Sequence, residues 1–260
     1  MSFDNLYRKF IESGIQESIN YDKFNRYLIT HHSSSIEGST LTVVETNLLL
    51  DEGITPKGKP LEHSLMVKDY YDALTFVLSK ARNRKPITPK FIREIASCVN
   101  KNTGKVNNTA LGHFDDSKGD YRLTSVTAGN EYFVAYDKVP GQVQEMCDSL
   151  NKHLPGKKTP ERVYQLSFDA HYYLVTIHPF GDGNGRTSRL LMNYIQAYHK
   201  QPLGLVFSED KADYIEALKA TRSSGNLSSV RKFMMDQLTK YFKNEIAQFK
   251  KKDRGLSFSF

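Results

Sequence analysis

The sequence predicts a protein built mainly of helices, with one short β-hairpin. Apolar residues recur about every three to four positions through most of the 260-residue chain, which is the spacing of one helix face. Only residues 121–136 show a different pattern, in which two short β-prone runs flank a Gly-Asn turn. A chain of this length can bury a sizeable core and form one domain with a helical extension.

The composition is that of an ordinary soluble protein, with 39% hydrophobic and 25% charged residues. No apolar run approaches the ~20 residues that cross a membrane, and the start of the chain does not resemble a secretory signal. Cys98 and Cys147 lack metal-ligand spacing, so we expect reduced thiols in a cytoplasmic protein that does not contact a membrane. The net charge of +7 is scattered, apart from Lys250–Lys252, and gives nucleic-acid binding no specific support.

The N-terminal part predicts helices separated by a polar turn. Residues 1–32 carry apolar side chains at helical spacing, without an interrupting proline, and predict helix throughout. Serines followed by an acid and a glycine predict a short helix at 33–38 that stops at Gly38. Thr42 and Glu45 have the spacing of a capping box and predict the start of the next helix.

The middle of the chain predicts two helices and a long polar loop. Residues 51–62 contain glycine and proline and predict a connector, after which 67–78 has helical periodicity. Thr88 and Pro89 suit the cap and the first position of another helix. Residues 102–120 are polar and predict a solvated loop. The acidic and histidine residues of that loop fit no standard metal-site spacing: His113, Asp115, Asp116 and Asp120.

The last part of the chain predicts a hairpin followed by helices. The runs 121–127 and 132–136 predict the two strands, and such a hairpin is stable only when it packs on another element. Residues 250–260 predict a frayed end. Helical periodicity predicts the remaining helices at 140–150, 163–177, 190–198, 209–221 and 227–247.

Residues 178–189 form the most informative stretch, because polar and glycine residues gather there between two strongly apolar helical patterns. Pro179 disfavours continuation of the first helix. Gly181, Gly183 and Gly185 then allow backbone conformations that are closed to other residues. A glycine-rich turn that opens directly onto a helix points unpaired N–H groups at one place, which suits phosphate.

The side chains of this stretch add chemistry to the turn. Arg186 and Arg189 are three positions apart, so we expect them to lie on one helix face and to add cationic donors. Asp182 supplies a hard oxygen ligand for Mg²⁺, and His178 is a group that titrates near neutrality. A plain helix-loop-helix corner would need neither the aspartate nor two arginines in register. The stretch therefore predicts a reaction centre for a nucleotide phosphate.

The same stretch is similar to the signature of the Fic family, HxFxDGNGRxxR. All the defining positions match: His178, Phe180, Asp182, Gly183, Asn184, Gly185, Arg186 and Arg189. Ser33, Glu37 and Gly38 also resemble the inhibitory motif S/T-x-x-x-E-G/N of Fic proteins that carry it before the core. Ser39 stands where many relatives have Asn. The resemblance implies an all-α fold, the Fic helical bundle, with a small β-hairpin flap as its only β element.

The resemblance also implies three parts along the chain. Residues 1–80 would form an N-terminal helical region that carries the inhibitory motif. Residues 81–245 would form the Fic catalytic core. Residues 246–260 would form a C-terminal tail.

The activity that the resemblance implies is that of a protein adenylyltransferase, which transfers AMP from ATP to a Ser, Thr or Tyr hydroxyl of a target protein. His178 would be the catalytic base, and Asp182 would hold Mg²⁺ between the phosphates. Relatives of this type can also remove AMP, and the sequence does not rank the two directions. The residues expected to bind ATP are Gly183, Asn184, Gly185, Arg186, Arg189 and, near the adenine, Tyr214.

The resemblance further implies how the reaction is controlled and how a target docks. Glu37, with Ser33 of the same motif, would pair with Arg189 and block productive placement of the ATP γ-phosphate. The flap would add its edge strand to the backbone of the target. The expected partners are ATP, a target protein and the chain itself as an auto-AMPylation target, in a monomer or a homodimer. The residues expected to dock the target are Thr124, Ser125 and Val126.

Two other functions remain open at this stage. A kinase-like phosphotransferase, as found among divergent Fic relatives, would bind ATP in the opposite sense. Those relatives usually depart from the pattern at the GNGR segment, and this chain does not. A non-catalytic module that binds a nucleotide or nucleic acid would keep the anion site and would not need His178.

Overall fold

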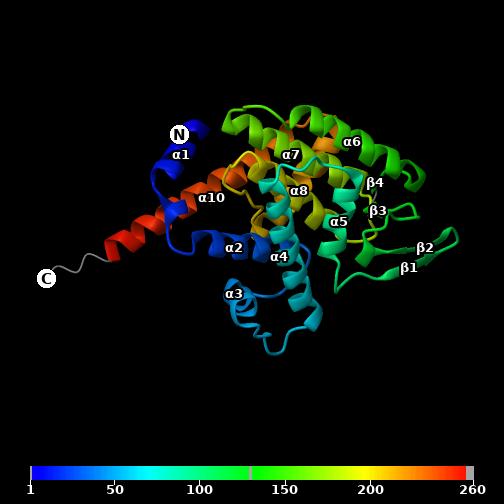
Figure 1. The fold of residues 1–260 in the computed structure, drawn as a ribbon, viewed down its shortest axis with the longest axis horizontal. Helices are drawn as coiled ribbons and strands as arrows, with labels where there is room; N and C mark the ends of the chain where they lie inside the picture. The colour runs from blue at the N-terminus through cyan, green and yellow to red at the C-terminus, as the bar shows by residue number, and fades with distance from the viewer. Residues whose placement is uncertain (1, 129–130, 256–260) are drawn as a thin grey trace.

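The computed structural model describes residues 2–128 and 131–255, and helices make up most of them (Figure 1). The predicted helical fold is confirmed. The helices are α1 Phe3–Glu12, α2 Tyr21–Ile36, α3 Val43–Glu52, α4 Leu61–Arg82, α5 Pro89–Val99, α6 Val139–His153, α7 Pro160–Ile177, α8 Asn184–Tyr198, α9 Lys211–Ser224 and α10 Ser228–Gly255. The strands are β1 Val106–Thr109, β2 Gly112–Asp115, β3 Thr127–Ala128 and β4 Glu131–Tyr132.

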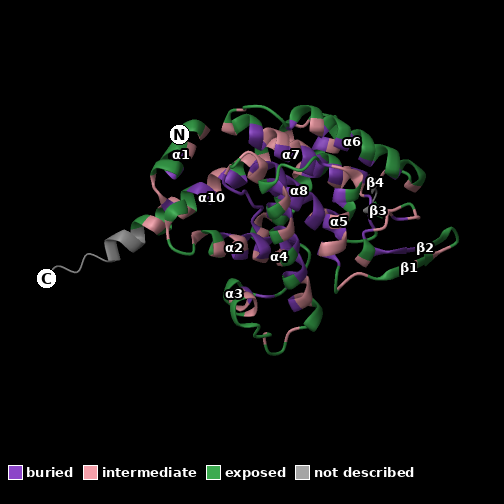
Figure 2. Ribbon diagram, in the orientation of Figure 1, coloured by how far each residue is buried: buried purple, intermediate pink, exposed green. Residues whose placement is uncertain are grey.

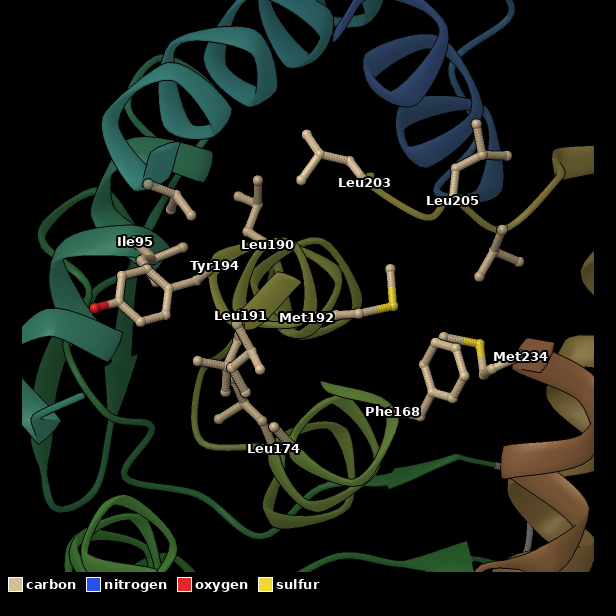
Figure 3. Packing of buried hydrophobic residues seen from close by; sticks show 14 of the residues in the cluster. Ile95, Phe168, Leu174, Leu190, Leu191, Met192, Tyr194, Leu203, Leu205 and Met234 are labelled. Carbon is tan, nitrogen blue, oxygen red and sulfur yellow. The ribbon is translucent and has the colours of Figure 1, made fainter. Parts of the chain in front are cut away.

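Helix α8 lies at the centre of the bundle and packs against α7, α4 and α5 (Figure 1). It is apolar on several sides, and Leu190, Leu191 and Tyr194 are 0% exposed. Figure 3 shows these side chains directed toward different neighbours, with Leu174 of α7 and Ile95 of α5 among them. A helix that is apolar all round is stable only when other elements cover it. The core therefore fixes the position of α8, and with it the turn that precedes this helix.

Buried residues are concentrated on α7 and α8, whereas α6 and the β1–β2 hairpin expose much of their surface (Figure 2). The long helix α10 closes one side of the bundle, where it packs against α7, α9 and α1. Helix α2 lies against α4 and also contacts α8. This last contact brings the N-terminal region to the start of α8, although the two segments are far apart in the sequence.

Two helices begin at their predicted caps. Thr42 Oγ1 accepts the N–H of Glu45 at 3.2 Å, and the Glu45 carboxylate accepts the N–H of Thr42 at 2.7 Å, which completes the capping box of α3. Thr88 Oγ1 accepts the N–H of Phe91 at 3.1 Å, and Pro89 is the first residue of α5. Both predictions are confirmed. The caps could be predicted from the sequence because a cap joins residues only three positions apart.

The prediction of continuous helix over residues 1–32 is wrong. The chain leaves α1 after Glu12 and enters α2 only at Tyr21. Between them Gly14 and Asn20 have φ values of 67° and 64°, in the left-handed region that interrupts a helix. The segment 33–38 is likewise no separate short helix, because its first residues form the end of the long helix α2.

The prediction of a loop over residues 102–120 is also wrong, and the flap is not the only β element. Strands β1 and β2 pair antiparallel there, with Val106 opposite Asp115 and Thr109 opposite Gly112. Half of the eight strand residues are of types depleted in strands, so the pattern did not reveal them: Asn107, Asn108, Gly112 and Asp115. Conversely, the hairpin predicted at 121–136 contains only β3 and β4, and the residues of its turn, 129–130, lie outside the described residues.

Two acidic residues of the β1–β2 region are buried, although we expected the loop to be solvated. Asp115 and Asp116 are 8% and 4% exposed. The Asp115 carboxylate accepts the N–H of Ser117 at 3.0 Å, and Asp116 accepts the Asn107 side-chain amide at 2.8 Å. Burial raises the pKa of Asp116. Hydrogen bonds from Ser117 and Asn107 thus replace part of the solvation of these carboxylates.

Helix α10 continues to Gly255, beyond the point from which we predicted fraying, and residues 256–260 lie outside the described residues. Cys98 and Cys147 are free thiols. In the described part of the chain, no helix is long and apolar enough to cross a membrane.

Two buried histidines predict that the fold loses stability in mild acid. His32 is 8% exposed and His171 is 0% exposed. Burial lowers the pKa of His32 to about 4 and that of His171 to about 3. In the unfolded chain both pKa values return to about 6.5. Below that pH the unfolded chain binds protons that the folded chain does not. As the pH is lowered below about 6.5, the free energy of unfolding should therefore decrease by about 1.4 kcal/mol per pH unit for each histidine.

Urea unfolding followed between about pH 7 and about pH 5 measures this slope. Asp69 and Asp116 act in the opposite direction, because burial raises the pKa of each. Replacement of His171 by glutamine isolates the contribution of that histidine, and the slope of the variant should be shallower. An unchanged slope would contradict the assignment of His171 as a neutral buried group.

Candidate active site

The turn between α7 and α8 is braced from within. Helix α7 ends at Ile177, and the next residue, His178, adopts the left-handed conformation with φ 53°. The Asn184 side chain accepts the N–H of Phe180 at 3.0 Å and donates to the Phe180 carbonyl at 2.9 Å. Phe180 is 1% exposed and anchors the turn in the core. The Asn184 amide group is thus occupied by the turn and does not face an open site.

Gly183 is required at the start of α8 for two reasons. Its φ of 79° lies in the left-handed region, and a Cβ at this position would lie 2.8 Å from Asn100 Nδ2. The Asn100 amide in turn donates to the Asp182 carbonyl at 3.1 Å. Asn100 follows α5 and is 0% exposed, so it supports the turn from beneath. No local pattern in the sequence indicated this role.

His178 is held as a neutral imidazole with one nitrogen available. Its Nδ1 lies 3.3 Å from the Val175 carbonyl, which can only accept, so Nδ1 carries the hydrogen and Nε2 carries the lone pair. The ring of Phe133 stacks on the imidazole with 4.0 Å between centroids. The Arg222 guanidinium lies 4.8 Å from the centroid of the Phe133 ring. Burial lowers the pKa of His178 to about 4, and the charges of Arg122 and Arg222 act in the same direction.

A carboxylate already lies at the amino end of α8. A Cβ on Gly185 would be 2.5 Å from Glu37 Oε1 and 3.1 Å from Arg189 Nη1. The absence of a side chain at Gly185 therefore lets the Glu37 carboxylate approach the first turn of the helix. Backbone N–H groups of a first turn lack partners within the helix and attract anions. The Gly183 N–H is an exception, because it donates to the Asp182 carboxylate at 2.6 Å.

Arg189 binds two residues of the N-terminal region at once. Its Nε donates to Ser33 Oγ at 2.7 Å, and its Nη2 donates to the Ser33 carbonyl at 3.1 Å and to Glu37 Oε1 at 2.7 Å. The structure thus brings together the three residues that the inhibitory motif predicted to meet. The Arg189 side chain is 3% exposed and that of Glu37 is 31% exposed. Burial disfavours the charged guanidinium, but the nearby Glu37 charge raises the pKa of Arg189 above its usual range.

We expected Arg186 and Arg189 to lie on one helix face. In the structure, Arg186 does not join Arg189 at a common anion site. It donates to the Val99 carbonyl at 3.2 Å, to Asn100 Oδ1 at 3.1 Å and to Asp182 Oδ2 at 2.9 Å. Residues three apart differ by about 60° around a helix axis. That difference is enough to direct one arginine toward the end of α5 and the other toward α2.

Asp182 lies at the open side of the turn. Its side chain is 62% exposed, and its two oxygens accept from the Gly183 N–H and from Arg186. Within residues 2–128 and 131–255, no group of three or more His, Cys, Asp or Glu residues could hold a metal ion by itself. Asp182 is therefore a carboxylate that the turn presents to solvent.

Tyr214 lies in the core and does not line an open adenine pocket. It is 2% exposed, and its hydroxyl lies 2.8 Å from His171 Nε2. The partner on α7 accounts for this placement, because a buried tyrosine hydroxyl needs a hydrogen-bond partner. His171, which is 0% exposed, is thus a structural residue of α7.

The predicted docking edge is held mainly by one arginine. Val126 accepts the Phe133 N–H at 3.4 Å, whereas the Thr124 carbonyl accepts from Arg122 Nη1 at 2.6 Å. Ser125 is exposed. The roles of Arg122 and Phe133 could not be predicted, because an arginine or a phenylalanine within a short β-prone run carries no local signal of its partners.

Residues 86–196 match the model of the Fic/DOC family. This region belongs to the Fic/DOC family. The chain is 29% identical over 207 residues to the protein adenylyltransferase Fic of Drosophila willistoni, and the match covers 79% of this chain and 39% of that protein. It is 30% identical over 213 residues to the protein adenylyltransferase fic-1 of Caenorhabditis briggsae, with 80% and 38% covered. It spans about two fifths of the length of these relatives.

The fold of the chain is also similar to a solved structure. A Fic domain containing signaling protein from Bacteroides thetaiotaomicron superposes with a TM-score of 0.77 at 24% sequence identity. The superposition covers 95% of this chain and 97% of that one. The likeness therefore extends beyond the matched family region to the helices on both sides of it.

Proposed function

We propose that this chain transfers AMP from ATP to a hydroxyl group of a protein. The observation that carries the proposal is the adjacency of a base and an anion site. His178 is neutral with Nε2 available, and the amino end of α8 already holds the Glu37 carboxylate. The names of the relatives, protein adenylyltransferases, support the same activity.

The reaction needs little covalent chemistry from the protein. The target oxygen attacks the α-phosphorus of ATP, the bond from that phosphorus to the bridging oxygen breaks, and pyrophosphate leaves. His178 Nε2 takes the hydroxyl proton, and the product is a phosphodiester between the target and AMP. The first-turn N–H groups of Asn184 and Gly185 stabilise the charge on the phosphates. During the reaction Arg186 would hold Asp182 in place, because Arg186 bonds both the Asp182 carboxylate and the end of α5.

The residues of the turn fit a magnesium ion that comes with ATP. Mg²⁺ commonly binds through one or two carboxylates together with substrate phosphates and water. Asp182 is the exposed carboxylate at the turn, and it keeps lone pairs free toward solvent. The ion would offset phosphate charge there. Asp182 would hold it from the protein side.

We propose that Glu37 inhibits the reaction by occupying the place of a phosphate. Its carboxylate bonds the same guanidinium that a γ-phosphate would need, and it lies against the first turn of α8. Ser33 holds Arg189 in this arrangement through its hydroxyl and its carbonyl. ATP can still displace the carboxylate, because the Glu37 side chain is partly open to solvent. The flap and the chain's own hydroxyl groups are the proposed docking site and a proposed target.

Labelled ATP tests the proposed function. The wild-type chain and a Glu37→Gly variant are incubated with ATP that carries the label on the α- or the γ-phosphate, and label on protein is measured. We expect α-label on protein and no γ-label. Transfer of the γ-label would show a kinase-like phosphotransferase, and bound ATP without transfer would show a non-catalytic module. Either of these results would overturn the proposal.

A further inference from the structure

The guanidinium of Arg122 joins two segments that the proposed reaction needs to keep together. Arg122 is 1% exposed. Its Nε donates to the His178 carbonyl at 2.7 Å, and its Nη2 reaches the Ile177 carbonyl at 3.5 Å. Its Nη1 donates to the Thr124 carbonyl at 2.6 Å, and its Nη2 also donates to the Val134 carbonyl. One side chain thus bonds the end of α7 and both sides of the flap.

A second contact strengthens the same connection. The backbone N–H of Arg122 donates to the Pro179 carbonyl at 3.0 Å. Phe133, the residue before Val134, stacks on the His178 ring. The flap therefore contacts His178 in two ways. Arg122 bonds the His178 backbone carbonyl, and Phe133 stacks on the face of the His178 imidazole. The edge of the ring that carries Nε2 is not covered by this stacking.

Arginine suits this position better than any other residue. The last carbonyls of α7 have no partners within the helix, and a cation is favourable at a helix C-terminus. The planar guanidinium presents several N–H donors in fixed directions, so that it can bond carbonyls of separate segments at once. A lysine would keep the charge, but its single ammonium group could not span the same four carbonyls.

We propose that Arg122 is a positioning residue, which holds the target-docking flap and the catalytic base His178 at a fixed separation. The inference rests on the proposed function, because it assigns a purpose to the flap and to the base. The flap would bring the target backbone to Thr124–Val126, and the tie through Arg122 would set how far the target hydroxyl lies from Nε2. A displacement of ~1 Å in such a geometry can cost ~10²-fold in rate.

The test uses three variants in the Glu37→Gly background, in which we expect transfer to be faster than in the wild type. Arg122→Lys keeps the charge and loses the fork, and Arg122→Gln loses both. Arg93→Gln is the matched control, because Arg93 also anchors this segment, through the Gly119 carbonyl at 2.8 Å and Asp120 at 2.6 Å, without contact to the end of α7. ATP binding is measured by calorimetry, and AMP transfer to protein is measured with α-labelled ATP.

We expect Arg122→Lys to bind ATP within about twofold of its parent and to transfer AMP at least about tenfold more slowly. Arg93→Gln should transfer AMP at nearly the parental rate. Equal rates for Arg122→Lys and its parent would overturn the proposal. So would a parallel loss of ATP binding and transfer, since that result would indicate general disruption of the site. If Arg122→Gln does not fold, the lysine variant decides the outcome.

Two further measurements do not depend on activity and separate this proposal from the proposed function. Amide hydrogen exchange of residues 122–128 and 131–134 should be at least about tenfold faster in Arg122→Lys than in the parent. NMR titration should show a higher pKa for His178 in Arg122→Gln, because a nearby positive charge has been removed. If neither the parent nor any variant transfers AMP, the proposed function fails. If amide exchange of the flap and the titration of His178 are both unchanged in the Arg122 variants, the positioning role is overturned, whatever the activity.

Discussion

Replacement of His178 by alanine is expected to lower the rate of AMP transfer by about 10²–10⁴-fold and to leave ATP binding unchanged. The imidazole is the group at the turn that can take the hydroxyl proton at neutral pH. Its pKa of about 4 keeps it unprotonated over the physiological range. In the proposed function the phosphates of ATP bind at the amino end of α8, which the substitution does not touch.

The measurement compares initial rates of α-label transfer with calorimetric ATP binding, both in the Glu37→Gly background. His153→Ala provides a matched control, because His153 is exposed at the end of α6 and lies outside the proposed site. Thermal unfolding checks that the His178 variant is folded. Transfer by a folded His178→Ala protein at the parental rate would remove His178 as the base.

Replacement of Glu37 by glycine is expected to raise the rate of AMP transfer by about 5- to 150-fold, the range typical of coupling between two sites. In the proposed inhibition Glu37 and the γ-phosphate compete for the guanidinium that Glu37 bonds in the structure, so loss of the carboxylate would leave Arg189 for the nucleotide. The substitution falls on the residue that caps α2, outside the helix proper, and Gly38 follows it with a φ of 107°. A second glycine at this point should therefore not disturb the helix.

The Glu37→Gly variant also predicts a change in thermal stability. It leaves a buried arginine without its carboxylate, which should lower the melting temperature in the absence of nucleotide. ATP should then raise the melting temperature more in the variant than in the wild type, because it supplies the missing anion. Glu52→Gly is the matched control, since Glu52 is an exposed residue at the end of α3. A folded Glu37→Gly protein with no gain in transfer would argue that the carboxylate does not inhibit.

The features that could be predicted from the sequence are those whose causes are local or belong to a known pattern. The capping box at Thr42 and the turn before Asn184 depend on residues within a few positions of each other. The pairing of Glu37 with Arg189 spans the chain, and only the two family motifs made it visible. In each case the residues themselves carried enough information, because either the backbone or the motif restricted the partners.

The features that could not be predicted depend on distant partners. Arg122 bonds carbonyls of four residues, and any residue type could supply those carbonyls. Arg186 turns toward Asn100, which no spacing connects with the glycine turn. The polar strands β1 and β2 are held by pairing and by buried carboxylates, and their side chains have little preference for strands. Three-dimensional packing decides such contacts, and local patterns do not record it.

The attachment of Ser33 and Glu37 to one guanidinium has a mechanical consequence. Three bonds to Arg189 come from the end of a single helix, α2, in the form of a hydroxyl, a carbonyl and a carboxylate. Rotation of the Ser33 or the Glu37 side chain would release only one of these bonds, whereas a tilt of the whole helix would release all of them together. The proposed inhibition would then end in a single step, and a partner that binds the surface of α2 and α3 directed away from Arg189 could end it.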